Sequence, residues 1–373
     1  MKKSLLALAA LAACAGAYAD VTITGSVAMG YKAARDSFGA DTSGLGVDTS
    51  SLTFAASEDL GGGQKIVATL GLDGVNRAGV GGGDTKLTYT NNAFGRIELG
   101  TAKDGDVFSS IAYGGANLIE FDGKLNQIKT SSDYISYAAP IGPVIFVFKH
   151  TEAGNDIANK AGFGGLGLGS GTQGAAATTT QGTNTLALVY KKDALSLVGA
   201  YRSYNNRNDS GNFSDDNSLT KSDVIHLEGG YDFGFVKIGA GADHVNAAWG
   251  VKQDNFIAGF SVPAGAWTFG AAWESSKVDG VSSAPWTAFH SNQAAATFVV
   301  KPLLVKTEGT ATGATFGAQY NLSKRTNIAF RYATWTRSGY EQLEAYKLNN
   351  KDQNQLGYKQ NETATDILLT HNF

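Results

Sequence analysis

The chain carries few side chains at spacings that support catalysis or metal binding. Its five histidines are scattered, and none lies at metal-ligand spacing from another: His150, His226, His244, His290 and His371. No serine lies in the strand–turn–helix context of a hydrolase nucleophile. Residues 162–167 fit the pattern G-x-G-x-x-G, but no buried strand precedes them and no helix follows, so they indicate a loop. These observations predict a protein that is not an enzyme and has no cofactor or metal.

Charged side chains recur at alternating positions within segments that are otherwise apolar. Six basic residues share the polar side of such a segment by this parity: Lys65, Lys86, Arg96, Arg202, Lys237 and Arg331. Strict alternation is typical of a β-strand with two different surroundings. If the polar side lines a water-filled passage, these cations act on ions and dipolar solutes that pass. The alternative interpretation is that they are solvated rim charges of little consequence.

The clearest alternating segment is the hairpin at residues 314–335 (ATFGAQYNLSKRTNIAFRYATW). Phe316, Tyr320 and Phe330 fall on one face, whereas Gln319 and Arg331 fall on the other. A soluble sheet would pack its apolar face on a second layer. A membrane barrel instead turns the apolar face to lipid and the polar face to a lumen.

About sixteen such strands follow from the alternation, and short and long connections join them in turn. The predicted strands are residues 21–32, 50–57, 64–73, 85–90, 95–102, 133–138, 144–150, 183–191, 194–203, 222–231, 235–244, 254–262, 266–275, the two arms of 314–335, and 363–373. An even count with tight turns at one end and longer loops at the other is typical of outer-membrane barrels. Because lipid offers no hydrogen-bond partners, such a sheet must close. We therefore predict an all-β fold, a transmembrane antiparallel β-barrel.

Residues 294–305 (AAATFVVKPLLV) leave the strand count open. They form either strand-like structure within a loop or an extra spanning hairpin, which would raise the count to eighteen. Pro302 disfavours a paired interior strand, because proline cannot donate to the hydrogen-bond ladder.

The N-terminus (MKKSLLALAALAACAGAYAD) has the pattern of an export signal: two lysines, an apolar stretch and the small-residue cleavage site AYA. We expect residues 1–19 to be a cleaved signal peptide and residues 20–373 to form one barrel domain. A competing interpretation is a bacterial lipoprotein site at Cys14, the only cysteine. The formal net charge of −3 falls further when the two lysines leave, and no nucleic-acid partner is predicted.

Five short segments together resemble the Gram-negative porin family of beta-proteobacteria. They are VTITG at residues 21–25, SEDLG at 57–61, FGRIELG at 94–100, NLSKRT at 321–326 and the terminal HNF at 371–373. Each segment is short, but their order and spacing cover nearly the whole mature chain. The resemblance implies a homotrimer of sixteen-stranded barrels in the outer-membrane lipid. It also implies that Phe373 is a signal to the barrel-insertion machinery.

The resemblance further implies that the third external loop, here about residues 103–130, folds into the lumen and narrows it. Acids on this loop would face basic residues on the opposite wall and create a transverse field. The residues assigned to this constriction are Asp104, Asp106, Glu120, Asp122, Lys65, Lys86, Arg96 and Arg331. The chain departs from the family's usual charged residues at Ala28, Ser51, Ala55 and Thr101. These departures weaken the expectation of a strong anion preference.

We therefore predict a non-enzymatic porin in the outer membrane of a Gram-negative cell. Small hydrophilic solutes and ions would cross it by passive diffusion, and the acidic excess favours a weak preference for cations. Three alternatives stay open: a substrate-selective channel of the same fold, a non-conducting surface adhesin or structural barrel, and a soluble all-β enzyme.

Overall fold

The protein is described by a computed structural model that covers residues 20–35, 40–76, 79–105, 108–121, 129–153, 182–205, 221–247, 252–282, 305–338 and 360–373. These residues form an all-β structure. Its strands are β1 (Asp20–Arg35), β2 (Asp41–Gly61), β3 (Gln64–Asn76), β4 (Gly79–Asn91), β5 (Gly95–Gly105), β6 (Lys129–Ile141), β7 (Val144–Ala153), β8 (Gly182–Lys192), β9 (Leu195–Asn205), β10 (Lys221–Asp232), β11 (Lys237–Ala247), β12 (Lys252–Ala264), β13 (Trp267–Ser282), β14 (Val305–Asn321), β15 (Thr326–Ser338) and β16 (Gln360–Asn372). Among the described residues, no helix is long and apolar enough to cross a membrane.

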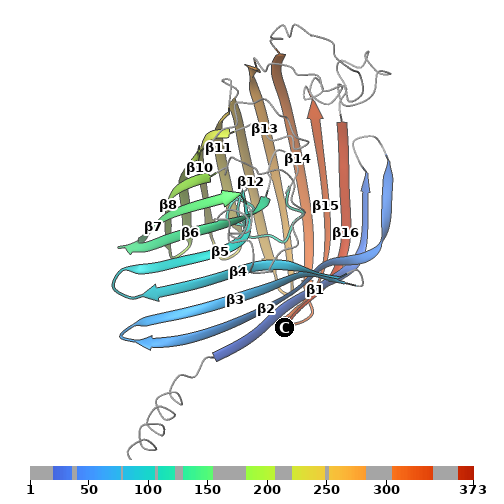
Figure 1. The fold of residues 1–373 in the computed structure, drawn as a ribbon. Helices are drawn as coiled ribbons and strands as arrows, with labels where there is room; N and C mark the ends of the chain where they lie inside the picture. Colours follow the sequence, from blue (N-terminus) through green and yellow to red (C-terminus); the bar gives the residue numbers. More distant parts are fainter. Residues whose placement is uncertain are drawn as a thin grey trace, which may run out of the picture.

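The strands form one closed antiparallel barrel in which each strand pairs with its neighbours in the sequence (Figure 1). The ring closes between β1 and β16, where Met29 lies opposite Leu369. The wall has sixteen strands, because β13 and β14 pair directly from Trp267 and Tyr320 to Ser282 and Val305. This closed ring of sixteen described strands confirms the smaller of the two predicted counts, and residues 294–304 lie outside the described residues.

Several strands are longer than their apolar alternation indicates. The strand β2 begins at Asp41 rather than near residue 50, because Asp41 already pairs with Arg35 of β1. Similarly, β14 begins at Val305, although a loop was predicted to continue to about residue 310. These extensions are rich in Gly, Ser, Thr and Asp, whose composition favours loops. Pairing with the neighbouring strand overrides that local preference, since a closed sheet leaves no backbone group unpaired.

The tight turns need residues that tolerate a left-handed backbone. Gly142 between β6 and β7 has φ 61°, and Asp193 between β8 and β9 has φ 51°. Asp and Gly are among the residues that adopt this conformation at least cost. Two-residue turns of this kind fix the register of the hairpins they close.

Many large apolar side chains of the strands point away from the barrel axis. Phe316, Phe330 and Leu369 are 51%, 47% and 51% exposed, respectively. Their neighbours along the strands, such as Ala329 and Leu368, are buried on the inner side. In the part of the chain that the structure describes, no second layer covers the outward aromatic face. A soluble sandwich is therefore excluded, because it would bury this face.

The hydrophobic core lies inside the barrel. Phe108, Tyr113, Leu118 and Phe121 pack with inward residues of the wall, including Trp335. These four core residues belong to the connection between β5 and β6. The connection between β5 and β6 therefore enters the barrel and fills part of its interior.

Candidate functional site

The connection between β5 and β6 folds into the barrel, and its described residues 108–121 are called the constriction loop below. The loop runs along the inner wall from β10 to β16, as its contacts with those strands show. The predicted range was residues 103–130, but β5 continues to Gly105 and β6 begins at Lys129. The loop narrows the space that the sixteen strands enclose.

The first turn of the constriction loop is attached to β10 and β11. The backbone N–H of Ser109 donates a 2.9 Å hydrogen bond to Oε2 of Glu228. The ring of Phe108 lies 5.5 Å from the imidazole of His226, centroid to centroid. His226 is buried, and its Nδ1 lies 2.5 Å from Oδ1 of Asp243 on β11. A buried carboxylate that accepts a backbone N–H holds the loop strongly at this point.

The middle of the constriction loop is hydrogen-bonded to β12, β14 and β15. The hydroxyl of Ser261 donates to the carbonyl oxygen of Gly114 at 2.6 Å. Asn117 donates through Nδ2 to Oε1 of Gln319 at 2.8 Å, and it accepts from Nη1 of Arg331 at 3.3 Å. These hydrogen bonds pair polar groups of the loop that would otherwise have no hydrogen-bond partner against the wall.

The last part of the constriction loop is held by packing. The backbone N–H of Phe121 donates to the hydroxyl of Tyr113 at 3.3 Å. The ring of Phe121 meets the indole of Trp335 edge to face, with centroids 6.5 Å apart. Aromatic pairs in this arrangement add to the stabilisation that burial already provides.

Arg331, one of the predicted constriction residues, lies on the inner wall within a network of charges. Its Nε and Nη2 donate to the two carboxylate oxygens of Asp366 at 2.8 and 2.7 Å. Its Nη2 also lies 3.8 Å from Asp48, which contacts Lys32. Arg331 thus joins β15, β16, β2 and the constriction loop. Its bidentate pair with Asp366 offsets its charge and fixes its position.

The other basic residues assigned to the constriction, Lys65, Lys86 and Arg96, lie on the inner face of β3, β4 and β5. Lys65 is opposite Thr90, and Thr90 is opposite Arg96, so the two cations share one row near the short turns. Lys86 lies farther along the wall, with Nζ 3.7 Å from Oδ2 of Asp84. These three cations therefore lie on strands other than those that the constriction loop contacts through its described residues.

The predicted acids of the constriction are described only in part. Glu120 is an exposed residue of the constriction loop. Asp104 lies in β5, where its backbone pairs with Thr130. Asp106 and Asp122 lie outside the described residues.

Sequence reasoning missed a group of carboxylates on the inner wall. Five of them are buried: Glu228, Asp243, Glu274, Glu362 and Asp366. Each lies on the inward parity of its strand, next to outward residues such as Leu227 and Trp273. Their alternating positions in the strands could therefore have predicted that these five carboxylates face the lumen. Their burial could not have been foreseen, because it depends on where the constriction loop packs.

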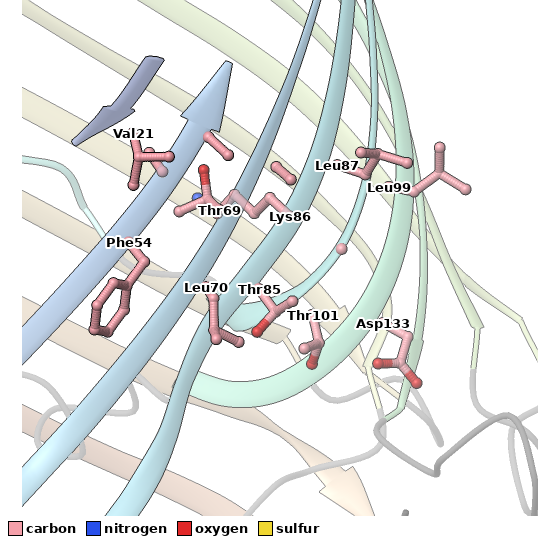
Figure 2. Close-up of a pocket in the computed structure, with 14 residues that line it drawn as sticks. Val21, Phe54, Thr69, Leu70, Thr85, Lys86, Leu87, Leu99, Thr101 and Asp133 are labelled. Carbon is pink, nitrogen blue, oxygen red and sulfur yellow. The ribbon is translucent and has the colours of Figure 1, made fainter. Parts of the chain in front are cut away.

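The outer surface has a hollow of about 630 Å³ over β1 to β6 (Figure 2). Figure 2 shows Leu87 and Leu99 at one side of it and Phe54 at the other, with Thr101 and Asp133 together at an edge. Its lining contains no histidine, cysteine or serine. Elsewhere in the described chain, no group of three or more His, Cys, Asp or Glu residues could hold a metal ion. The barrel interior is therefore the better candidate for the functional site.

Comparisons with known proteins agree with this geometry. A sequence model described as Gram-negative porin matches residues 7–340. The structure is similar to an anion-selective porin from Comamonas acidovorans, with TM-score 0.58, 18% identity, and coverage of 95% of this chain and 100% of that chain. It is also similar to a trimer form of OmpT, an outer membrane protein of Vibrio cholerae, with TM-score 0.55, 12% identity, and coverage of 95% and 99%. No curated protein sequence matches.

Proposed function

Because this chain belongs to the Gram-negative porin family and is an outer-membrane porin, we propose that small hydrophilic solutes and ions diffuse passively past its constriction loop. The observation that supports this most directly is the loop itself. Hydrogen bonds to four strands hold it against one side of the barrel interior, and polar and charged side chains line the strands on the other side. A fixed obstruction in a water-filled barrel sets an upper limit on solute size.

Liposome swelling tests this proposal. Vesicles that contain the purified protein are placed in isotonic solutions of neutral sugars of increasing size. The proposal expects fast swelling with small sugars and a sharp fall in rate as size increases. Vesicles without protein are the control. Equal, slow swelling of both preparations would contradict the proposal and favour a non-conducting adhesin or structural barrel. Saturation with one sugar only would favour a substrate-selective channel.

We propose that the ion preference is weak. The acidic excess of the sequence favours cations, but five inner-wall carboxylates are buried and contribute little to the passage. By contrast, Lys65 and Arg96 are exposed on the inner wall, and Lys86 is partly exposed. Charges that face the passage act on ions directly, whereas distant loop charges are screened by salt. Asp84 and Glu98, both partly exposed, lie on the same inner wall as these cations, and the opposing charges support a weak preference.

We propose that the protein assembles as a homotrimer. Membership of the porin family supports this, as does the similar fold of OmpT, which has a trimer form. Electrophoresis of the unheated, detergent-solubilised protein, together with native mass spectrometry, would test it. The expected mass is three times that of the mature chain. A monomer that conducts in bilayers would contradict the homotrimer and leave the channel function intact.

We also propose that Phe373 marks the chain for the barrel-insertion machinery. Its backbone N–H and C=O each pair with Gly25 at 3.0 Å, so the last residue closes the ring between β16 and β1. The side chain of Phe373 is 44% exposed, so another protein can reach it. The predicted signal peptide lies outside the described residues and stays a prediction.

A further inference from the structure

Several glycines lie on the inner wall under the constriction loop. Gly230 pairs with Gly239, Gly239 pairs with Gly259, and Gly270 pairs with Gly317, so the residues lie side by side on neighbouring strands. Each is on the inward face of its strand. At the positions on β11, β12, β13 and β14, the loop backbone or a loop side chain occupies the space where a Cβ atom would lie.

The distances leave no room for a methyl group at these positions. A Cβ on Gly239 would lie 1.8 Å from the carbonyl oxygen of Ile111, and one on Gly259 would lie 2.9 Å from the backbone of Tyr113. A Cβ on Gly270 would lie 2.3 Å from the Cβ of Ala116. Carbon atoms in contact are normally about 3.5–4.0 Å apart. The glycines therefore permit an approach that any other residue would prevent.

Backbone conformation does not explain these glycines. Gly239, Gly259 and Gly270 have no left-handed φ, so other residues could adopt the same backbone. Glycine also weakens a strand, because it has no side chain to pack and loses more conformational freedom on folding. The benefit that remains is space for the constriction loop.

Resting on the proposed function, we infer that these wall glycines set the width of the passage by fixing how deep the constriction loop lies against the wall. The wall is the stiffer of the two partners, because continuous ladders hold β12, β13 and β14 together. A side chain added to the wall therefore displaces the loop, and the only free direction is toward the passage. The glycines are positioning residues: they act on solutes through the loop.

The contact between Gly270 and Ala116 allows a direct test, because one methyl group can be moved across it. Gly270→Ala adds a methyl to the wall, and Ala116→Gly removes one from the loop. In Gly270→Ala the two Cβ atoms must separate by about 1.2 Å or more to reach normal contact. The matched control is Gly82→Ala, a strand glycine at which an added Cβ would meet nothing within 4 Å.

Single-channel conductance in planar bilayers is measured for the wild type, both single variants, the double variant and the control. We expect Gly270→Ala to lose conductance by on the order of a tenth or more, since current scales with open cross-section. The double variant should return to the wild-type value, and Gly82→Ala should match it. Thermal stability of all variants in detergent separates a narrowed passage from a damaged barrel.

Unchanged conductance in a folded Gly270→Ala variant would overturn the inference, as would failure of Ala116→Gly to restore it. Gly239→Ala is a second variant with a closer contact, and it should lose more conductance than Gly270→Ala. These outcomes are distinct from failure of the proposed function, in which the wild-type protein itself carries no current.

Discussion

Phe330→Arg distinguishes a lipid-facing wall from a water-facing one. Phe330 lies at the centre of an outward apolar patch, with Ala318 and Ile367 opposite it on the two neighbouring strands. Ile328 and Tyr332 lie two residues away on the same face. Its side chain is 47% exposed, although it is aromatic. In water, replacing so exposed a side chain would change stability little.

In a membrane the same change is costly. An arginine on the lipid face of a barrel costs about 2–4 kcal/mol near the bilayer midplane and about 0–1 kcal/mol near the interfaces. The apolar neighbours on all four sides of Phe330 indicate a position near the midplane. We therefore expect the free energy of unfolding to fall by about 3 kcal/mol. Guanidinium unfolding of the protein in lipid vesicles, followed by tryptophan fluorescence, measures the change.

Thr24→Arg is the matched control for this prediction. Thr24 is exposed and lies on the inward face of β1, between the outward residues Ile23 and Gly25. An arginine there enters the water-filled side, so stability should change by less than about 1 kcal/mol. Equal effects of the two arginines, or no loss with Phe330→Arg, would refute the assignment of lipid and water to the two faces.

Three further predictions concern the charges of the interior and the end of the chain. Asp366→Ala leaves the largely buried Arg331 without its bidentate partner, and it should cost about 3 kcal/mol in the same unfolding assay, whereas a loss below the experimental error would show that the pair does not anchor the wall. Replacing Lys86 and Arg96 together with glutamine should shift the zero-current potential toward cations; Lys192→Gln, at the exposed end of β8, is the control and should leave it unchanged. Phe373→Ala should reduce the fraction of protein inserted in the outer membrane, measured as heat-modifiable protein in membrane fractions, and normal insertion would contradict its role as a signal.

The wall could be predicted from the sequence because its pattern is local. Alternation over residues 314–335 places Phe316 and Phe330 outward and Arg331 inward without any knowledge of their neighbours. The same reasoning failed for residues 41–49, which belong to β2 although they are rich in Gly, Ser and Asp. Their strand conformation comes from pairing with β1, which no local pattern records.

The interior could be predicted only in part, because its contacts join residues far apart in the chain. Strand parity places Glu228 and Asp366 in the lumen, but it does not show that the constriction loop buries Glu228 or that Arg331 offsets Asp366. The hydrogen bond between Asn117 and Arg331 spans more than 200 residues. A lumen charge that is counted from strand parity alone therefore includes buried carboxylates that do not face the passage.

Electrical recording from the purified protein in a planar bilayer across a potassium chloride gradient tests the central claim, that the barrel encloses an aqueous passage narrowed by the constriction loop. We predict discrete current steps that increase linearly with voltage and a small zero-current potential. Absence of current steps from folded, membrane-inserted barrels would contradict the claim.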